Sequence, residues 1–190
     1  MSRVLHLIVC GAGPAGQVTD MVELARQDGW DTYCIVTEAA AEHFVDLDEL
    51  GKISGHQVRT TYRAVGDDPV PPADAVIVAP ATYNTINKWA AGVADNYALT
   101  QLAELTGAGV RIVAVPFVNQ ALAANAVFLR SVESLRASGV RVLFGPGEFE
   151  PHPPRTGGSA LDAFPWKLAL QAASYRPPAR NVSGAVSDEQ

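Results

Sequence analysis

The chain has 190 residues, a length that favours one domain with a core large enough to fold without disulfides. Acidic residues outnumber basic ones by 20 to 14, which argues against a nucleic-acid-binding protein. No apolar run reaches the roughly 18 residues of a membrane span. Both cysteines, Cys10 and Cys34, lie in apolar segments rather than in a disulfide framework. We therefore expect a cytoplasmic protein without membrane, nucleic-acid or metal partners.

Apolar segments and helix-like spacing alternate along the chain. Buried strands are predicted at residues 4–10, 31–37, 58–63, 74–79, 110–115 and 140–144. Helices are predicted at residues 14–28, 38–50, 82–93, 95–106, 119–137 and 161–174. This order favours a three-layer, Rossmann-like or flavodoxin-like α/β fold with a doubly wound parallel sheet of about six strands. We predict a single domain over residues 1–175 and a disordered polar tail at residues 176–190.

A glycine-rich turn follows the first predicted strand and reads GAGPAG at residues 11–16. Such a turn lets backbone N–H groups approach a phosphate at a helix start, and alone it favours FAD or NAD(P). However, the second strand ends at Thr37, where a dinucleotide-binding protein has an acidic residue for the ribose. The chain is also short for a two-domain FAD oxidoreductase. We predict that a mononucleotide phosphate is bound by Gly11, Gly13, Pro14, Ala15 and Thr37.

Two alternatives to phosphate binding stay open for this region. The glycine motif could serve a dinucleotide or only shape the turn. The hydroxyl of Thr37 could cap the next helix, a role that is compatible with ligand binding.

A second motif follows the fourth predicted strand. Residues 80–85 read PATYNT, and the following segment ends with GVADN at residues 92–96. Thr82 and Thr85 are three residues apart at a helix start, so their hydroxyls face the same way beside N–H groups that lack helical partners. Anions and the polar edge of a flavin suit such a position, although Thr82 could also be an ordinary helix cap.

This block resembles the homo-oligomeric flavin-containing cysteine decarboxylases, whose signature is P-A-S-A-N-T and a helix ending in G-x-A-D-N. The resemblance extends over roughly residues 3–145. It implies an FMN-binding domain that forms homotrimers or dodecamers of trimers. It also assigns FMN contacts to Ala81, Thr82, Asn84 and Thr85.

This chain departs from the family pattern at the positions that carry catalysis in the family. Its block P-x-M-N-x-x-M-W keeps Pro116 and Asn119 here, but both methionines and the tryptophan are replaced. The resemblance implies that Asn119 contacts a substrate carboxylate, with capping of the next helix as the alternative. The family histidine would fall at Gly66, and His56, ten residues earlier, is a weak catalytic candidate. His152, in the loop at residues 145–159, could also reach a ligand.

The late flap of the family carries a cysteine, but no cysteine follows Cys34 in this chain. We therefore expect an FMN flavoprotein that acts as a decarboxylase-like or related redox enzyme on a small-molecule or peptide carboxylate. One alternative is a family member that binds flavin without catalysis. The other is a Rossmann-type oxidoreductase that uses NAD(P) or FAD.

Overall fold

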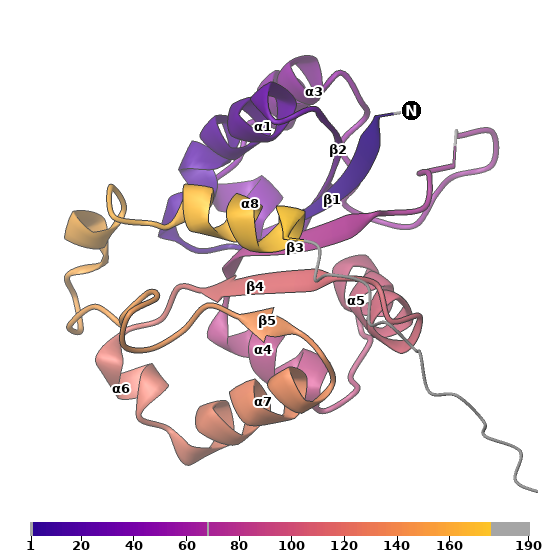
Figure 1. The fold of residues 1–190 in the computed structure, drawn as a ribbon. Helices are drawn as coiled ribbons and strands as arrows, with labels where there is room; N and C mark the ends of the chain where they lie inside the picture. The colour runs from indigo at the N-terminus through magenta and orange to yellow at the C-terminus, as the bar shows by residue number, and fades with distance from the viewer. Residues whose placement is uncertain (1, 68, 176–190) are drawn as a thin grey trace, which may run out of the picture.

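The computed structural model describes residues 2–67 and 69–175, and within them five parallel strands form one sheet (Figure 1). The strand order is β2-β1-β3-β4-β5. The strands are β1 (Arg3–Val9), β2 (Trp30–Val36), β3 (Ala75–Ala81), β4 (Ile112–Pro116) and β5 (Arg141–Val142). The three-layer α/β fold class is confirmed, with five strands instead of about six. The predicted disordered tail at residues 176–190 lies outside the described residues.

Helices cover both faces of the sheet (Figure 1). One face carries α1 (Val18–Gln27), α3 (Leu47–Ser54) and α8 (Trp166–Ser174). The other carries α4 (Tyr83–Ala90), α5 (Tyr97–Gly107) and α7 (Ala126–Ala137). In the part of the chain that the structure describes there are also four shorter helices, namely η1 (Gly13–Gln17), α2 (Glu38–His43), α6 (Gln120–Ala123) and η2 (Gly157–Ala160). Among the described helices, none has the length and apolar character of a membrane span.

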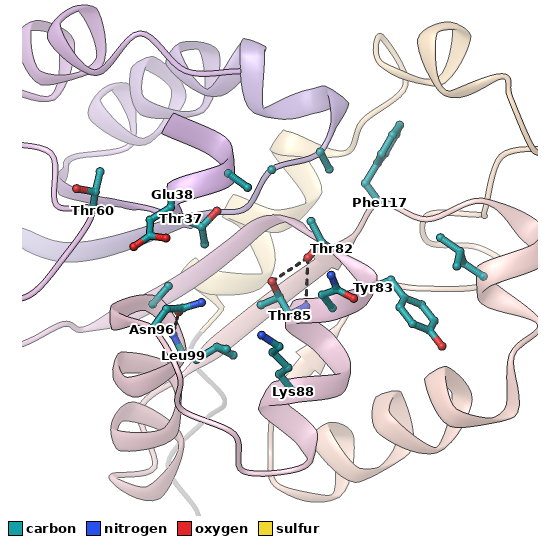
Figure 2. Close-up of a pocket in the computed structure, with 16 residues that line it drawn as sticks. Thr37, Glu38, Thr60, Thr82, Tyr83, Thr85, Lys88, Asn96, Leu99 and Phe117 are labelled. Carbon is teal, nitrogen blue, oxygen red and sulfur yellow. Dashed lines mark hydrogen bonds between the residues drawn. The ribbon is translucent and has the colours of Figure 1, made fainter. Parts of the chain in front are cut away.

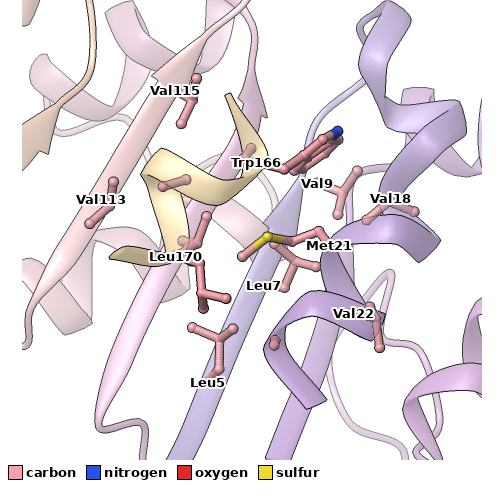
Figure 3. Packing of buried hydrophobic residues seen from close by; sticks show 14 of the residues in the cluster. Leu5, Leu7, Val9, Val18, Met21, Val22, Val113, Val115, Trp166 and Leu170 are labelled. Carbon is pink, nitrogen blue, oxygen red and sulfur yellow. The ribbon is translucent and has the colours of Figure 1, made fainter. Parts of the chain in front are cut away.

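The core is divided by the sheet because successive side chains of a strand point to opposite faces. Leu5 and Leu7 of β1 pack with Met21 of α1 and Leu170 of α8, as Figure 3 shows. Ile8 of the same strand instead belongs to the cluster on the α4, α5 and α7 face. Complete burial of side chains of this size contributes about 1.5–3 kcal/mol each. Burial on both sides explains why the strands read as nearly continuous apolar runs.

The strand predicted at residues 58–63 is wrong. Of residues 58–63, only Arg59 pairs with β2. Its N–H donates to the carbonyl of Cys34 over 2.9 Å, and its carbonyl accepts from the N–H of Val36 over 2.7 Å. The residues that follow, 60–63, are polar or aromatic and largely exposed. They offer no apolar face to bury, so the pairing ends after one residue.

Two predicted helices are each divided by a capping residue. The Asp46 side chain accepts from the N–H groups of Asp48 and Glu49, both over 3.0 Å, and starts α3 apart from α2. The Asn125 side chain accepts from Val127 over 2.9 Å and separates α7 from α6. Asp and Asn compete with helical hydrogen bonding in a helix interior, so they favour a new start there.

Candidate functional site

An open pocket of about 560 Å³ lies beyond the carboxyl ends of β1, β2 and β3 (Figure 2). Ligands of open parallel sheets bind in this position, and the volume is typical of small-molecule sites. The pocket is lined by the turn after β1, by the starts of α2, α4 and α5, and by Phe117 and Leu122 after β4. The structure therefore brings together the two motifs that the sequence singled out.

The starts of three helices point N–H groups toward the pocket, beside the carboxylate of Glu38. Thr37, Thr82 and Asn96 occupy the N-cap positions of α2, α4 and α5, and each lines the pocket. The N–H groups of a first helical turn lack helical partners and carry partial positive charge. Lys88 adds a cation at the pocket and pairs with Asp95 over 2.5 Å. The arrangement suits an anionic group such as a phosphate.

Glycines let the turn after β1 lie close to its neighbours. A Cβ on Gly11 would lie 3.1 Å from the backbone carbon of Ala39, so only glycine fits this approach to α2 without a shift. A Cβ on Gly13 would lie 2.8 Å from Leu161 Cδ2. Gly11 lines the pocket. The other residues predicted to bind phosphate here, Gly13, Pro14 and Ala15, do not line it, and Pro14 and Ala15 are buried.

The Thr37 side chain lines the pocket, and the predicted capping by its hydroxyl is not observed. Thr37 occupies the N-cap position of α2, but its side chain makes no capping hydrogen bond. The side chain lines the pocket, and Figure 2 shows it beside Glu38 at the N-terminus of α2. The hydroxyl is therefore uncommitted within the helix and can meet a ligand.

Thr82 and Thr85 form a hydrogen-bonded pair at the start of α4 (Figure 2). The hydroxyl of Thr82 accepts from the Thr85 N–H over 3.1 Å, and the two hydroxyl oxygens are 2.9 Å apart. Capping by Thr82 is confirmed, and both side chains line the pocket. The exposed Asn84 also lines it, whereas Ala81 is completely buried below.

Asn119 is not among the residues that line the pocket, although Phe117 and Leu122, on either side of it in the sequence, both do. The Oδ1 of Asn119 accepts from the Leu122 N–H over 3.0 Å, so the predicted capping role is confirmed. Asn119 also forms a parallel bridge with His152, whose ring centroid is 4.9 Å from that of Phe117. The late loop thus packs against the segment that carries Asn119.

His56 is not brought to the pocket. Its Nε2 is 2.5 Å from Asp31 Oδ1, and its ring stacks on Tyr33 with 3.9 Å between centroids. Asp31 lies near the start of β2, whereas the pocket lies beyond the end of that strand at Thr37. Within the described chain, His56 therefore lies away from this pocket.

Sequence reasoning missed several residues of the pocket wall. Asn96 caps α5 by accepting from the Leu99 N–H over 2.9 Å, and its place in the GVADN block was a signal for it. Lys88, one turn after Thr85 on the same helix, could have been found from helical spacing. Thr60 lies in an irregular segment that no pattern identifies.

Comparisons with known proteins agree with this geometry. The model of the Flavoprotein family matches residues 2–157. A search of curated protein sequences found no significant match. The structure of the FMN-dependent cysteine decarboxylase SpaF is 26% identical, with a TM-score of 0.67 over 92% of this chain and 98% of that chain.

Two further solved structures share the fold. TvaF, an FMN-dependent cysteine decarboxylase from thioviridamide biosynthesis, is 24% identical with a TM-score of 0.68, over 91% of this chain and 99% of that chain. The FMN binding protein AtHal3 is 18% identical with a TM-score of 0.64, over 92% of this chain and 100% of that chain. The chain belongs to the Flavoprotein family, and its resemblance to the flavin-containing cysteine decarboxylases is confirmed.

Proposed function

We propose that the chain binds FMN in this pocket and acts as a decarboxylase-like or related redox enzyme on a small-molecule or peptide carboxylate. The observation that carries the proposal is the meeting of three helix starts and the uncommitted Thr37 hydroxyl at one pocket. Family membership and the likeness to SpaF, described as an FMN-dependent cysteine decarboxylase, support the same cofactor.

The residues present fit the two ends of FMN. The phosphate suits Gly11, Thr37 and the first turn of α2, where donors and partial positive charge gather. Gly13, Pro14 and Ala15 shape the turn that holds Gly11 in place. The flavin ring suits the opposite wall, where the Thr82–Thr85 pair supplies polar groups and Leu99 and Phe117 supply apolar contact. Bound there, FMN supplies the capacity to accept electrons from a substrate.

Asn119 is the residue proposed to orient the substrate carboxylate. Its Oδ1 is engaged by the Leu122 N–H, which leaves the amide NH₂ as the donor for a ligand. The side chain is half-buried and belongs to the segment between Phe117 and Leu122, which both line the pocket, so we expect a carboxylate held there to lie near the pocket.

A member that binds flavin without catalysis is the second candidate. Among the described residues that line the pocket, the ionisable side chains are those of Glu38, Lys88 and Tyr83, with no histidine or cysteine. AtHal3, which has the same fold, is described as an FMN binding protein. The two candidates differ in chemistry and share the cofactor.

Purification of the chain tests the cofactor first. We expect a yellow protein whose released chromophore has the mass of FMN, or an apoprotein that takes up added FMN and quenches its fluorescence. Release of FAD or NAD(P) would support the Rossmann oxidoreductase instead. Absence of any flavin, with no uptake of added FMN, would overturn the proposal. Detection of CO₂ from a panel of carboxylates, including peptides that end in cysteine, would then exclude the binding-only candidate.

We also propose that the protein is cytoplasmic and assembles as a homotrimer or a dodecamer of trimers. Exposed apolar side chains on α6 and α7 support assembly, with exposed fractions of 39% for Leu122, 48% for Val127 and 44% for Leu129. Leu122 also lines the pocket, so a neighbouring subunit on this surface would help to enclose it. Light scattering on the purified protein would reveal a monomer if this is wrong.

A further inference from the structure

Cys10 lies directly beneath the pocket, between the glycine turn and the start of α4. It follows β1 and is 1% exposed, within the cluster on the α4 and α5 face of the sheet. Its backbone N–H donates to the Pro80 carbonyl over 3.0 Å. This bond ties the end of β1 to the segment that leads into Thr82.

The sulfur of Cys10 contacts the first turn of α4 twice. The Thr85 hydroxyl donates to Cys10 Sγ over 3.4 Å. The backbone N–H of Thr82 also hydrogen-bonds to the thiol. Thr85 is buried, with only 8% of its surface exposed, and it lines the pocket. Its hydroxyl is therefore held from below by Cys10 and from the side by Thr82.

The thiol is suited to a hydrogen-bonding role and not to a nucleophilic one. Burial raises the pKa of Cys10, although the hydrogen bonds from Thr85 and from the Thr82 N–H act in the opposite direction. The sulfur therefore stays a neutral thiol at physiological pH, and only the thiolate is an effective nucleophile.

We propose that Cys10 is a positioning residue of the FMN site, which fixes the Thr85 hydroxyl, and through it the Thr82 hydroxyl, in the orientation that meets the cofactor. The inference rests on the proposed binding of FMN. A hydroxyl rotates freely about its C–O bond unless a partner holds it. A hydroxyl that is already held does not have to be ordered when the ligand binds, so the affinity is higher.

Cys34 is a matched control for Cys10. It is also 1% exposed, but it belongs to the cluster on the α1 and α8 side of the sheet. Burial raises the pKa of Cys34 to about 12. Cys34→Ala therefore removes the same atoms from an equally buried site that has no contact with α4.

Fluorescence titration with FMN compares the full-length protein with three variants. Cys10→Ala should weaken FMN binding about three- to tenfold, the effect of losing one hydrogen-bonding partner. Cys34→Ala should change the affinity less than twofold, and Cys10→Ser, which keeps a hydrogen-bonding group, should restore most of the loss. Equal effects of Cys10→Ala and Cys34→Ala would overturn the inference while FMN binding by the wild type stands.

A double-mutant cycle separates positioning from general packing. If Cys10 acts through Thr85, Cys10→Ala should cause little further loss of FMN affinity in a Thr85→Val background. Additive losses would show that Cys10 acts independently of that hydroxyl and would overturn the inference. A wild-type protein that binds no FMN would overturn the proposed function and this inference together.

Discussion

His56 Nε2 lies 2.5 Å from Asp31 Oδ1, near the start of β2. Thr37, at the pocket, follows the end of the same strand. Thr37 is six positions after Asp31 along extended chain, a span of about 20 Å. The histidine that the sequence offered as a weak catalytic candidate thus belongs to a separate cluster with Asp31 and Tyr33.

Substitution of His56 should leave the pocket unchanged. We expect His56→Gln to bind FMN with wild-type affinity and to lower the free energy of unfolding by less than about 1 kcal/mol, because the pair with Asp31 is partly exposed. Fluorescence titration and urea unfolding measure the two quantities. A marked loss of FMN affinity or of turnover with intact folding would place His56 in the chemistry after all.

The Thr37 hydroxyl should contribute to phosphate binding and little to folding. Because the side chain makes no capping hydrogen bond, Thr37→Val should barely change the thermal midpoint. It should weaken FMN binding by roughly tenfold, since hydrogen bonds to charged groups contribute about 1.5–3 kcal/mol. Riboflavin, which lacks the phosphate, should bind the variant and the wild type alike, and Thr37→Ser should behave as wild type. Parallel loss of riboflavin binding would contradict a role at the phosphate.

We expect glycine to be required at position 13 for stability, because the Leu161 side chain leaves no room for a larger residue. A Cβ at this position would lie 2.8 Å from Leu161 Cδ2, so Gly13→Ala should lower the free energy of unfolding by about 1–3 kcal/mol. Leu161→Ala should recover much of this loss in the double variant, as measured by urea unfolding. Gly11→Ala should have no such rescue, because Ala39 opposes its Cβ partly with backbone atoms. A double variant no more stable than Gly13→Ala would refute this explanation.

Much of the fold and the pocket could be predicted from local sequence signals. The continuous apolar runs identified the sheet strands, and the Thr82 block identified a capped helix start that lines the pocket. Asp46 and Asn125 are equally clear capping signals, and each starts a new helix where the apolar spacing alone predicts a single longer one. The single pairing at Arg59 has no periodic pattern and could not be distinguished from a short strand.

Contacts between segments that are distant in the sequence could not be predicted from local patterns. The bridge between Asn119 and His152 joins the late loop to the segment after β4, and no local pattern specifies it. Phe117 directly follows β4, where alternation alone does not say whether a side chain meets the core or a ligand. The position of His56 depends on its partner Asp31, which is distant in the sequence.

His6 should make folding sensitive to acid. Its Nε2–H donates to the Pro71 carbonyl over 2.9 Å, and its buried Nδ1 has no described partner. Burial lowers the pKa of His6, although the bond to Pro71 opposes this shift. Below a pH of about 6.5 the unfolded chain binds a proton that the folded protein excludes, so stability falls between that pH and the lowered pKa.

Urea unfolding at a pH of about 7.5 and of about 5.5 tests this linkage. The wild type should lose more stability on acidification than His6→Gln, which lacks the titrating ring. His43, exposed on α2, provides the control, and His43→Gln should keep the wild-type pH dependence. An identical pH dependence in the wild type and His6→Gln would contradict the assignment.

Asn119 allows capping and substrate binding to be separated. Asn119→Ala removes both the oxygen that caps α6 and the amide NH₂, whereas Asn119→Ser keeps a capping oxygen alone. Both variants should retain FMN by absorbance and lose CO₂ release from any carboxylate that the wild type consumes. Only Asn119→Ala should also lower the free energy of unfolding, by about 1 kcal/mol. Asn125→Ala, which loses the cap of α7, should be destabilised to a similar degree but remain active. Wild-type turnover by Asn119→Ser would show that the amide does not hold the substrate carboxylate.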